Sequence, residues 1–245
     1  GLPNRLFLRQ KDGSLKDITK LSNTGWLDYC ASALILDFDN DGDKDIAISQ
    51  NFKILFMDNI GDLKFELALG LGTHAQTFSI SSADFDNDGD LDLFLCGYNP
   101  PSGPESESGV MGEPMPYHDA KNGGKNKMLR NDGNWNFTEV TEECGLNQNN
   151  DRFSFASSWH DYDGDGDLDL YVANDYGRNN LYQNNDGRFL DVAKELGVED
   201  MSAGMSVSWG DYDRDGVSDL YVSNMFSSAG NRITYQRQFK SEDNP

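Results

Sequence analysis

Short apolar runs recur in pairs along the chain, and an acidic stretch joins the two runs of each pair. The first run is mostly rich in small residues, whereas the second is almost entirely apolar. Apolar runs this short, bounded by Gly, Asn and Asp, are typical of β-strands. A strand that is apolar on both faces is expected to lie between two other sheets. The predicted first strands are 32–36, 78–82, 155–159 and 205–209, and the predicted second strands are 46–48, 93–95, 170–172 and 220–222.

A hairpin is predicted after each of the first three pairs and also at the start of the chain. Residues 179–189 place an Asp-Gly turn between two strand-like runs, which is a typical hairpin signal. Similar text occurs at 126–137 and at 4–15, and a degenerate version runs from Ile54 to Gly70. The chain therefore begins with the last two strands of a unit, contains three whole units, and ends with the first two strands of another. The predicted units are 1–24, 25–74, 75–147, 148–199 and 200–245.

The acidic stretches follow one nine-residue pattern, Asp-aromatic-Asp-x-Asp-Gly-x-x-Asp, in four copies: 37–45, 84–92, 161–169 and 211–219. Neighbouring copies are about 50 residues apart, apart from one longer gap, and repeats of this length indicate propellers or arrays. We therefore expect an all-β fold, a β-propeller of four-stranded blades. The two end units could pair and close a four-bladed ring, or the chain could be part of a larger propeller. We favour the larger propeller, because residues 235–245 show no closing role.

The net charge of the chain and the residue types in the loops limit which partners and metal ions the protein can bind. The net charge is −22, which excludes a basic surface for nucleic acid. Crowded carboxylates repel one another, and a hard divalent cation removes that cost. Oxygen-only ligands argue against zinc and copper, and magnesium is disfavoured because it retains several waters. An EF-hand is excluded, because position twelve would be Glu there and is Ile48, Leu95, Val172 and Val222 here.

The loops therefore predict about four Ca²⁺ sites, one in each copy. The carboxylates at positions one, three and five can converge on an ion, and the glycine at position six permits the turn. Position seven is expected to donate its backbone carbonyl, because it is Val in the last copy, and position nine closes the site. The candidate ligands are Asp37, Asp39, Asp41, Asp43, Asp45, Asp84, Asp86, Asp88, Asp90, Asp92, Asp161, Asp163, Asp165, Asp167, Asp169, Asp211, Asp213, Asp215, Val217 and Asp219.

These motifs resemble the FG-GAP or VCBS repeats, whose calcium loops lie in the propeller of integrin α subunits. The hairpin text is most similar to the branch that includes ASPIC/UnbV proteins and cartilage acidic protein. The resemblance implies a propeller, usually seven-bladed, with calcium between strands one and two. It carries positions one, three, five and nine over as side-chain ligands and position seven as a carbonyl. The chain departs from the family in lacking literal Phe-Gly and Gly-Ala-Pro triplets.

Other conspicuous residues are expected to be structural. Cys96 and Cys144 align with small or apolar residues of other copies, which predicts buried hydrophobic positions. His160, Trp159 and Trp209 are expected to be structural or core residues for the same reason. An insertion at 97–124, which contains Tyr117, His118 and Asp119, is either a partner-binding loop or a tolerated surface excursion.

The function predicted from these features is a calcium-binding module for extracytoplasmic protein or glycan recognition or adhesion. Sites of this type fill where calcium is near millimolar, so we expect an extracellular, periplasmic or cell-surface location. No catalytic group can be assembled from the spacing, and we therefore expect no enzyme activity. Nor does any apolar run suffice to span a membrane. The alternatives are a subunit of an extracytoplasmic enzyme complex, with a site in the propeller channel, and a scaffold component of a larger assembly.

Overall fold

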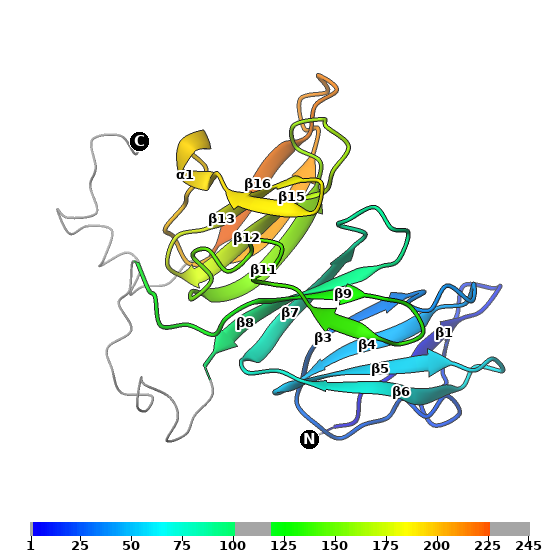
Figure 1. Cartoon of the computed structure of the whole chain (residues 1–245). Helices are drawn as coiled ribbons and strands as arrows, with labels where there is room; N and C mark the ends of the chain where they lie inside the picture. The colour runs from blue at the N-terminus through cyan, green and yellow to red at the C-terminus, as the bar shows by residue number, and fades with distance from the viewer. Residues whose placement is uncertain (1, 101–118, 226–245) are drawn as a thin grey trace.

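The described part of the protein consists of five antiparallel sheets. The computed structural model describes residues 2–100 and 119–225 (Figure 1). Three of the sheets have four strands each, and two-stranded sheets stand before and after them in the chain. The two-stranded sheets contain β1 (Phe7–Arg9) and β2 (Leu15–Asp17), and β15 (Gly204–Gly210) and β16 (Asp219–Asn224). The predicted all-β fold with four-stranded sheets is confirmed, and blade number stays a prediction.

The four-stranded sheets keep their strands in the order of the chain. Each strand pairs with the next one in its sheet, and β8 and β9 pair in this way although the insertion separates them in the chain. The first sheet contains β3 (Cys30–Leu36), β4 (Asp45–Gln50), β5 (Lys53–Asn59) and β6 (Phe65–Gly72). The second contains β7 (Gln76–Ala83), β8 (Asp92–Asn99), β9 (Lys127–Asn131) and β10 (Phe137–Glu139), and the third contains β11 (Phe153–His160), β12 (Asp169–Tyr176), β13 (Asn180–Asn185) and β14 (Arg188–Asp191).

The hydrophobic core is divided among the interfaces between successive sheets. Leu170 and Val172 of β12 pack in a cluster with β8 and β9 residues of the preceding sheet. Tyr171, which lies between them in sequence, packs toward Val207 and Trp209 of β15 in the following sheet. Because side chains alternate along a strand, the second strand of a sheet needs apolar residues at every position to serve both interfaces. This confirms the prediction made from its uniformly apolar sequence.

Two regions differ from the simple repeat. The segment after β14 forms a single helical turn, α1 (Ala193–Leu196), which ends at Gly197 with a φ of 70°. In the second sheet, β8 continues through Asn99, so residues 97–99 belong to a strand and not to the insertion. Residues 101–118 of the expected insertion, with Tyr117 and His118, lie outside the described residues, as does the tail 226–245, whereas Pro100 and residues 119–124 of the insertion are described.

Candidate metal centre

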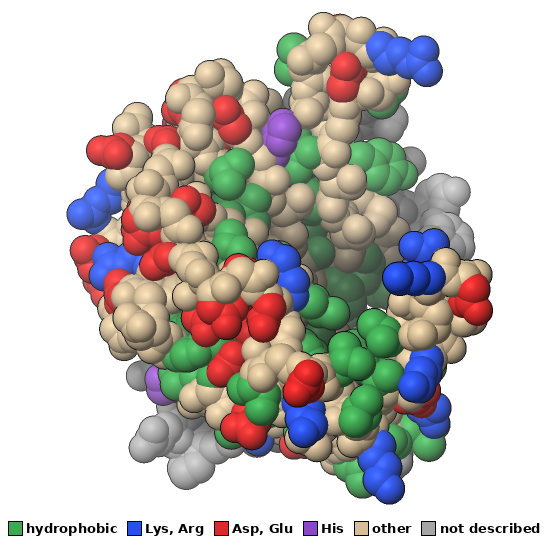
Figure 2. Space-filling model, turned by 90° about the vertical axis from the view of Figure 1, so that its right-hand side faces the viewer, with side chains coloured by type: hydrophobic (Ala, Val, Ile, Leu, Met, Phe, Trp, Pro, Cys, Tyr) green, Lys and Arg blue, Asp and Glu red, His purple; other side chains and the backbone are tan. Residues whose placement is uncertain are grey.

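The four aspartate loops connect the first and second strands of their sheets, and they follow one another along one side of the molecule (Figure 1). Acidic side chains are prominent on the face shown in Figure 2, whose centre is hollowed and lined with hydrophobic side chains. In each loop, three carboxylates offer oxygen atoms that all lie within 4.8 Å of one another. The groups are Asp37, Asp39 and Asp41; Asp84, Asp86 and Asp92; Asp161, Asp163 and Asp169; and Asp211, Asp213 and Asp219.

These groups bring together the predicted side chains of positions one and three in every loop. Position nine joins them in loops two, three and four, and position five joins them in loop one. The remaining predicted ligands lie outside the groups: Asp45, Asp88, Asp165 and Asp215, and all four residues of position seven. Val217 at position seven is 60% exposed, so its side chain points to solvent. The roles of positions five and seven in holding an ion therefore stay predictions.

The aspartate at position one shapes the turn by accepting a backbone N–H from the glycine at position six. The oxygen–nitrogen distance is 3.1 Å for Asp37 and Gly42, and 3.0 Å in each of the other three loops. These glycines have φ between 92° and 99°, a region that L-residues with side chains rarely adopt. The residue at position four also has a positive φ in every loop; these residues are Asn40, Asn87, Gly164 and Arg214. The local sequence thus turns the chain tightly enough to gather its carboxylates.

The aspartate at position nine has a structural role that the sequence did not suggest. Asp45, Asp92 and Asp169 are completely buried, and each is the first residue of its strand. One carboxylate oxygen accepts the N–H of position two, at 2.9 to 3.1 Å, and the other accepts an N–H from the third strand, at 2.8 to 3.0 Å. Burial raises the pKa of Asp92 to about 7 and those of Asp45 and Asp169 to about 6, although these N–H groups lower it.

Three carboxylate oxygens in the loops are buried without a hydrogen-bond donor: Oδ1 of Asp37, of Asp43 and of Asp86. A buried acceptor without a donor is costly, so each such atom suggests a missing partner. Burial raises the pKa of Asp86, and the neighbouring Asp88 and Asp84 add to the effect. All potential metal-ligand atoms in the groups are carboxylate oxygens, which are the ligands that a hard cation such as Ca²⁺ prefers. The residues present therefore fit a calcium ion.

An asparagine on the third strand organises the loops, and sequence reasoning missed it. The N–H of Asn184 donates to Asp169, and its Oδ1 accepts the N–H of Gly187 in the hairpin turn. Its Nδ2 donates to the carbonyl of Leu168 in its own loop and to that of Phe85 in the preceding loop. Asn131 repeats this pattern one sheet earlier, with Phe38 as the partner in the preceding loop. The signal in the sequence is a repeated Asn two or three positions before the hairpin glycine.

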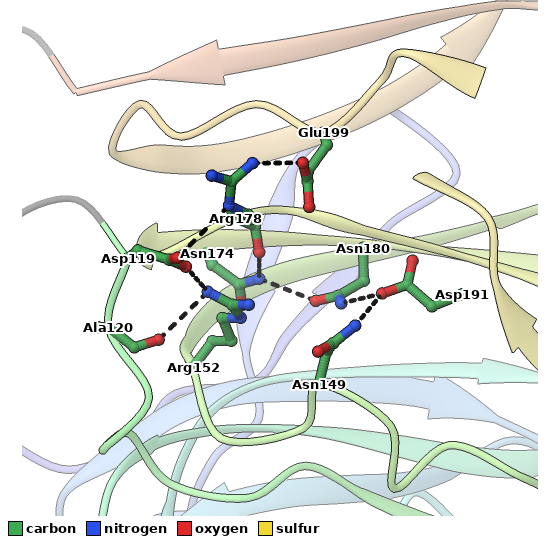
Figure 3. Close-up of polar contacts among 9 residues, drawn as sticks. All are labelled: Asp119, Ala120, Asn149, Arg152, Asn174, Arg178, Asn180, Asp191 and Glu199. Atoms are coloured by element: carbon green, nitrogen blue, oxygen red, sulfur yellow. Dashed lines mark hydrogen bonds and ion pairs between the residues drawn. The ribbon is translucent and has the colours of Figure 1, made fainter. Parts of the chain in front are cut away.

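A network of charged and amide side chains surrounds the start of the third sheet (Figure 3). Arg152 is 4% exposed and donates to the Asp119 carboxylate and to the carbonyl of Ala120. Arg178 bridges Asp119 at 3.5 Å and Glu199 at 2.5 Å. Removing one partner from a buried ion pair leaves an uncompensated charge. These pairs therefore fix the described chain from Asp119 onward against the third sheet.

A cleft of about 500 Å³, lined mostly by polar residues and called the polar cleft below, lies at the end of the second sheet's strands that is opposite its aspartate loop. It is lined by residues that precede β7 and by residues at the start of β9 and the end of β10. Asn126 and Asn150 exchange hydrogen bonds of 2.8 and 3.0 Å in its wall. Exposed Lys125 and His74 also line the cleft. The Lys125 ammonium group and the His74 imidazole can hydrogen-bond a polar ligand.

The other residues singled out from the sequence are structural. Cys96 and Cys144 are buried free thiols, as predicted. The indole N–H of Trp159 donates to the hydroxyl of Ser81 in the preceding sheet, and Trp159 packs against the core there. His160 stacks on Trp209 with ring centroids 5.1 Å apart. Among the described residues, no helix is long and apolar enough to cross a membrane.

Comparison with known proteins places a repeat on part of the chain. Residues 161–222, which run from the third aspartate loop through the fourth, match the FG-GAP-like repeat. This match confirms the resemblance to FG-GAP repeats, whereas the closer resemblance to ASPIC/UnbV proteins stays a prediction. No curated protein matches the sequence.

Solved structures resemble this chain at low sequence identity. An Agrocybe aegerita lectin that recognises non-reducing terminal N-acetylglucosamine is 17% identical, with a TM-score of 0.50 over 90% of this chain and 55% of the lectin chain. BBS1N in complex with ARL6DN is 11% identical, with a TM-score of 0.47 over 81% of this chain and 51% of that one. The chain thus spans about half the length of either structure. The likeness to the lectin concerns the fold alone and supports a propeller-like arrangement of the sheets.

Proposed function

We propose that this chain, which carries an FG-GAP-like repeat at 161–222, is a calcium-binding β-propeller module for protein or glycan recognition outside the cytoplasm. The geometry of the aspartate loops supports the calcium part of the proposal. Each of the four loops gathers three carboxylates within 4.8 Å, and buried oxygens of Asp37 and Asp86 in these groups have no donor. A bound Ca²⁺ would supply positive charge to these oxygens, and the ligands would come from positions one, three, five and nine and from the carbonyl of position seven.

The calcium is proposed to be structural, because the same residues that gather carboxylates also connect strands. Position one accepts the N–H of position six, and position nine joins the loop to the third strand. With the loop ordered, these hydrogen bonds fix the direction in which the second strand leaves the turn. Metal binding is then coupled to folding, because the unfolded chain offers no such arrangement.

The calcium proposal is tested by titration calorimetry and thermal melting. We expect about four Ca²⁺ per chain, with dissociation constants of about 10⁻⁴ to 10⁻³ M, as in extracellular modules. EGTA should lower the melting temperature, and Ca²⁺ should restore it where Mg²⁺ does not. The variant Asp163→Asn should lose one site, whereas Glu195→Gln, which removes an exposed charge in α1, should retain all four. An unchanged melt in EGTA would refute structural calcium, and sub-micromolar affinity would argue for a cytoplasmic protein.

The recognition part of the proposal is supported by the polar cleft beside Asn126 and Asn150 and by the fold shared with a lectin. The cleft lies at the end of the strands opposite the aspartate loop, so a ligand could bind there without displacing calcium. A panel of immobilised glycans and extracellular proteins, probed with the calcium-loaded chain, tests this part. The expectation that the chain is not an enzyme stays a prediction, and a turnover screen with the same preparation tests it.

A further inference from the structure

Neighbouring aspartate loops are joined to each other by a side-chain hydrogen bond that recurs at the same loop positions. The amide Nδ2 of Asn40, at position four of the first loop, donates to Oδ1 of Asp90, at position seven of the second, at 2.5 Å. Likewise, Nδ2 of Asn87, at position four of the second loop, donates to Oδ1 of Asp167, at position seven of the third, at 2.9 Å. We call each of these bonds a latch. The bonded residues are 50 and 80 positions apart in the chain.

The third pair of loops lacks both halves of the latch. Position four of the third loop is Gly164, and position seven of the fourth loop is Val217. A positive φ at position four accounts for Asn or Gly there, because both tolerate the left-handed region. It does not account for the residue at position seven of the next loop, whose carboxylate adds like charge to an acidic turn. The donor and the acceptor are present together in two pairs of loops and absent together in the third pair. This is expected if each residue is present because it forms the hydrogen bond with the other.

The latch connects the parts of the loops that carry the proposed ligands. Asn87 stands between Asp86 and Asp88, and Asp167 is the residue whose carbonyl is proposed to bind the next ion. The Asp167 side chain also accepts the N–H of Asp186 at 2.7 Å, which joins it to the hairpin turn of its own sheet. Beside the latch, Asn184 Nδ2 donates to the Phe85 carbonyl of the preceding loop at 2.8 Å. Ordering one loop therefore restricts the neighbouring one.

We propose that the first three aspartate loops form a coupled row, in which cation binding in one loop raises the affinity of the next through the latches, whereas the fourth binds independently of the latch. This inference rests on the proposed calcium function. The physical reason is conformational entropy. An ion that orders residues 84–92 holds Asn87 in place, so less freedom remains to be lost when Asp167 is ordered by the next ion. Coupling of this kind is reciprocal between the two loops.

The test removes the latch and also installs it where it is missing, with Ca²⁺ titrated into the full chain by calorimetry. Asn87→Gly should weaken binding by about threefold to tenfold, the range of an ordinary net hydrogen bond, because this bond is exposed to solvent. In an Asp167→Val background, which copies Val217, the same Asn87→Gly change should have no effect on affinity. Conversely, Gly164→Asn should strengthen binding in a Val217→Asp background and not in the natural chain. Asn51→Gly is the matched control, because Asn51 is exposed with a φ of 53° in a turn outside the loops.

The possible results distinguish failure of the coupling from failure of calcium binding. Equal effects of Asn87→Gly in the natural and Asp167→Val backgrounds would overturn the coupling while leaving the calcium sites in place. A chain that binds no Ca²⁺ would overturn both the coupling and the proposed function. Melting of the natural chain, Asn87→Gly, Asp167→Val and the double variant in EGTA then reports whether the hydrogen bond itself stabilises the protein. A threefold or larger change that appears only when both partners are present supports the coupled row.

Discussion

Replacing Asn184 with Asp tests whether the third-strand asparagine holds two sheets together. The change keeps the shape of the side chain and the oxygen that accepts the N–H of Gly187. It removes the two Nδ2 hydrogen bonds, to the carbonyls of Phe85 at 2.8 Å and of Leu168 at 3.1 Å. Asn184 is completely buried, so neither carbonyl is expected to regain its bond from bulk water. The new carboxylate would also lie close to that of Asp169, which accepts the Asn184 N–H.

The expected cost follows from these contacts. Leaving a buried carbonyl without a donor costs about 1–3 kcal/mol, so the two together cost about 3 kcal/mol or more in the free energy of unfolding. For a domain of this size that corresponds to a drop of roughly 6–12 °C in melting temperature. The effect should be larger than that of Asn59→Asp, because the Asn59 amide donates only to Lys44 in its own loop and is partly exposed.

Urea unfolding monitored by tryptophan fluorescence, at fixed calcium, measures this difference. The control is Asn185→Asp, which introduces the same charge at the exposed neighbouring position of the hairpin. Comparison with this control separates the lost hydrogen bonds from the added net charge. If Asn184→Asp and Asn185→Asp unfold within about 0.5 kcal/mol of each other, the usual range for surface substitutions, then the asparagine does not join the sheets as argued.

Two further predictions concern the loop turn and the thiols. Gly166→Ala should destabilise the protein by about 1 kcal/mol or more, because Gly166 has a φ of 98°. The control Gly210→Ala should cost less, because an added Cβ at Gly210 also lies within 4 Å of no other atom but the residue has no positive φ. Equal melting temperatures of the two variants would contradict this. In native protein at pH 8, iodoacetamide should label the partly exposed Cys30 first. Burial raises the pKa of Cys96 to about 12 and that of Cys144 to about 11, so these two residues have little reactive thiolate. Early labelling of Cys96, detected by mass spectrometry, would refute this prediction.

Much of the site was predictable because it is local in sequence. The glycine at position six and the alternating aspartates lie within nine residues, so their spacing alone predicts a tight turn with converging carboxylates. The structure brings positions one and three together in all four loops. Position nine was predicted only as a ligand, because its bonds to the N–H groups of the third strand depend on which strand lies beside it.

The roles of the asparagines could not be predicted from spacing. Asn184 bonds to Phe85, 99 positions away, and Asn87 bonds to Asp167, 80 positions away. Such pairs depend on how one sheet stacks on the next, and the intervening length varies because of the insertion after β8. A repeated Asn is visible in the sequence, but its partner belongs to the preceding repeat.

The sequence by itself determined the strands, the hairpins and the chemistry of the loops, because short-range periodicity and turn residues act between near neighbours. Only the tertiary structure decided which loops contact each other, which aspartates are buried, and which carboxylate oxygens have no donor. Those properties arise when sheets stack and exclude water. Stacking brings together residues that the chain keeps far apart, and burial then determines the strength of each contact.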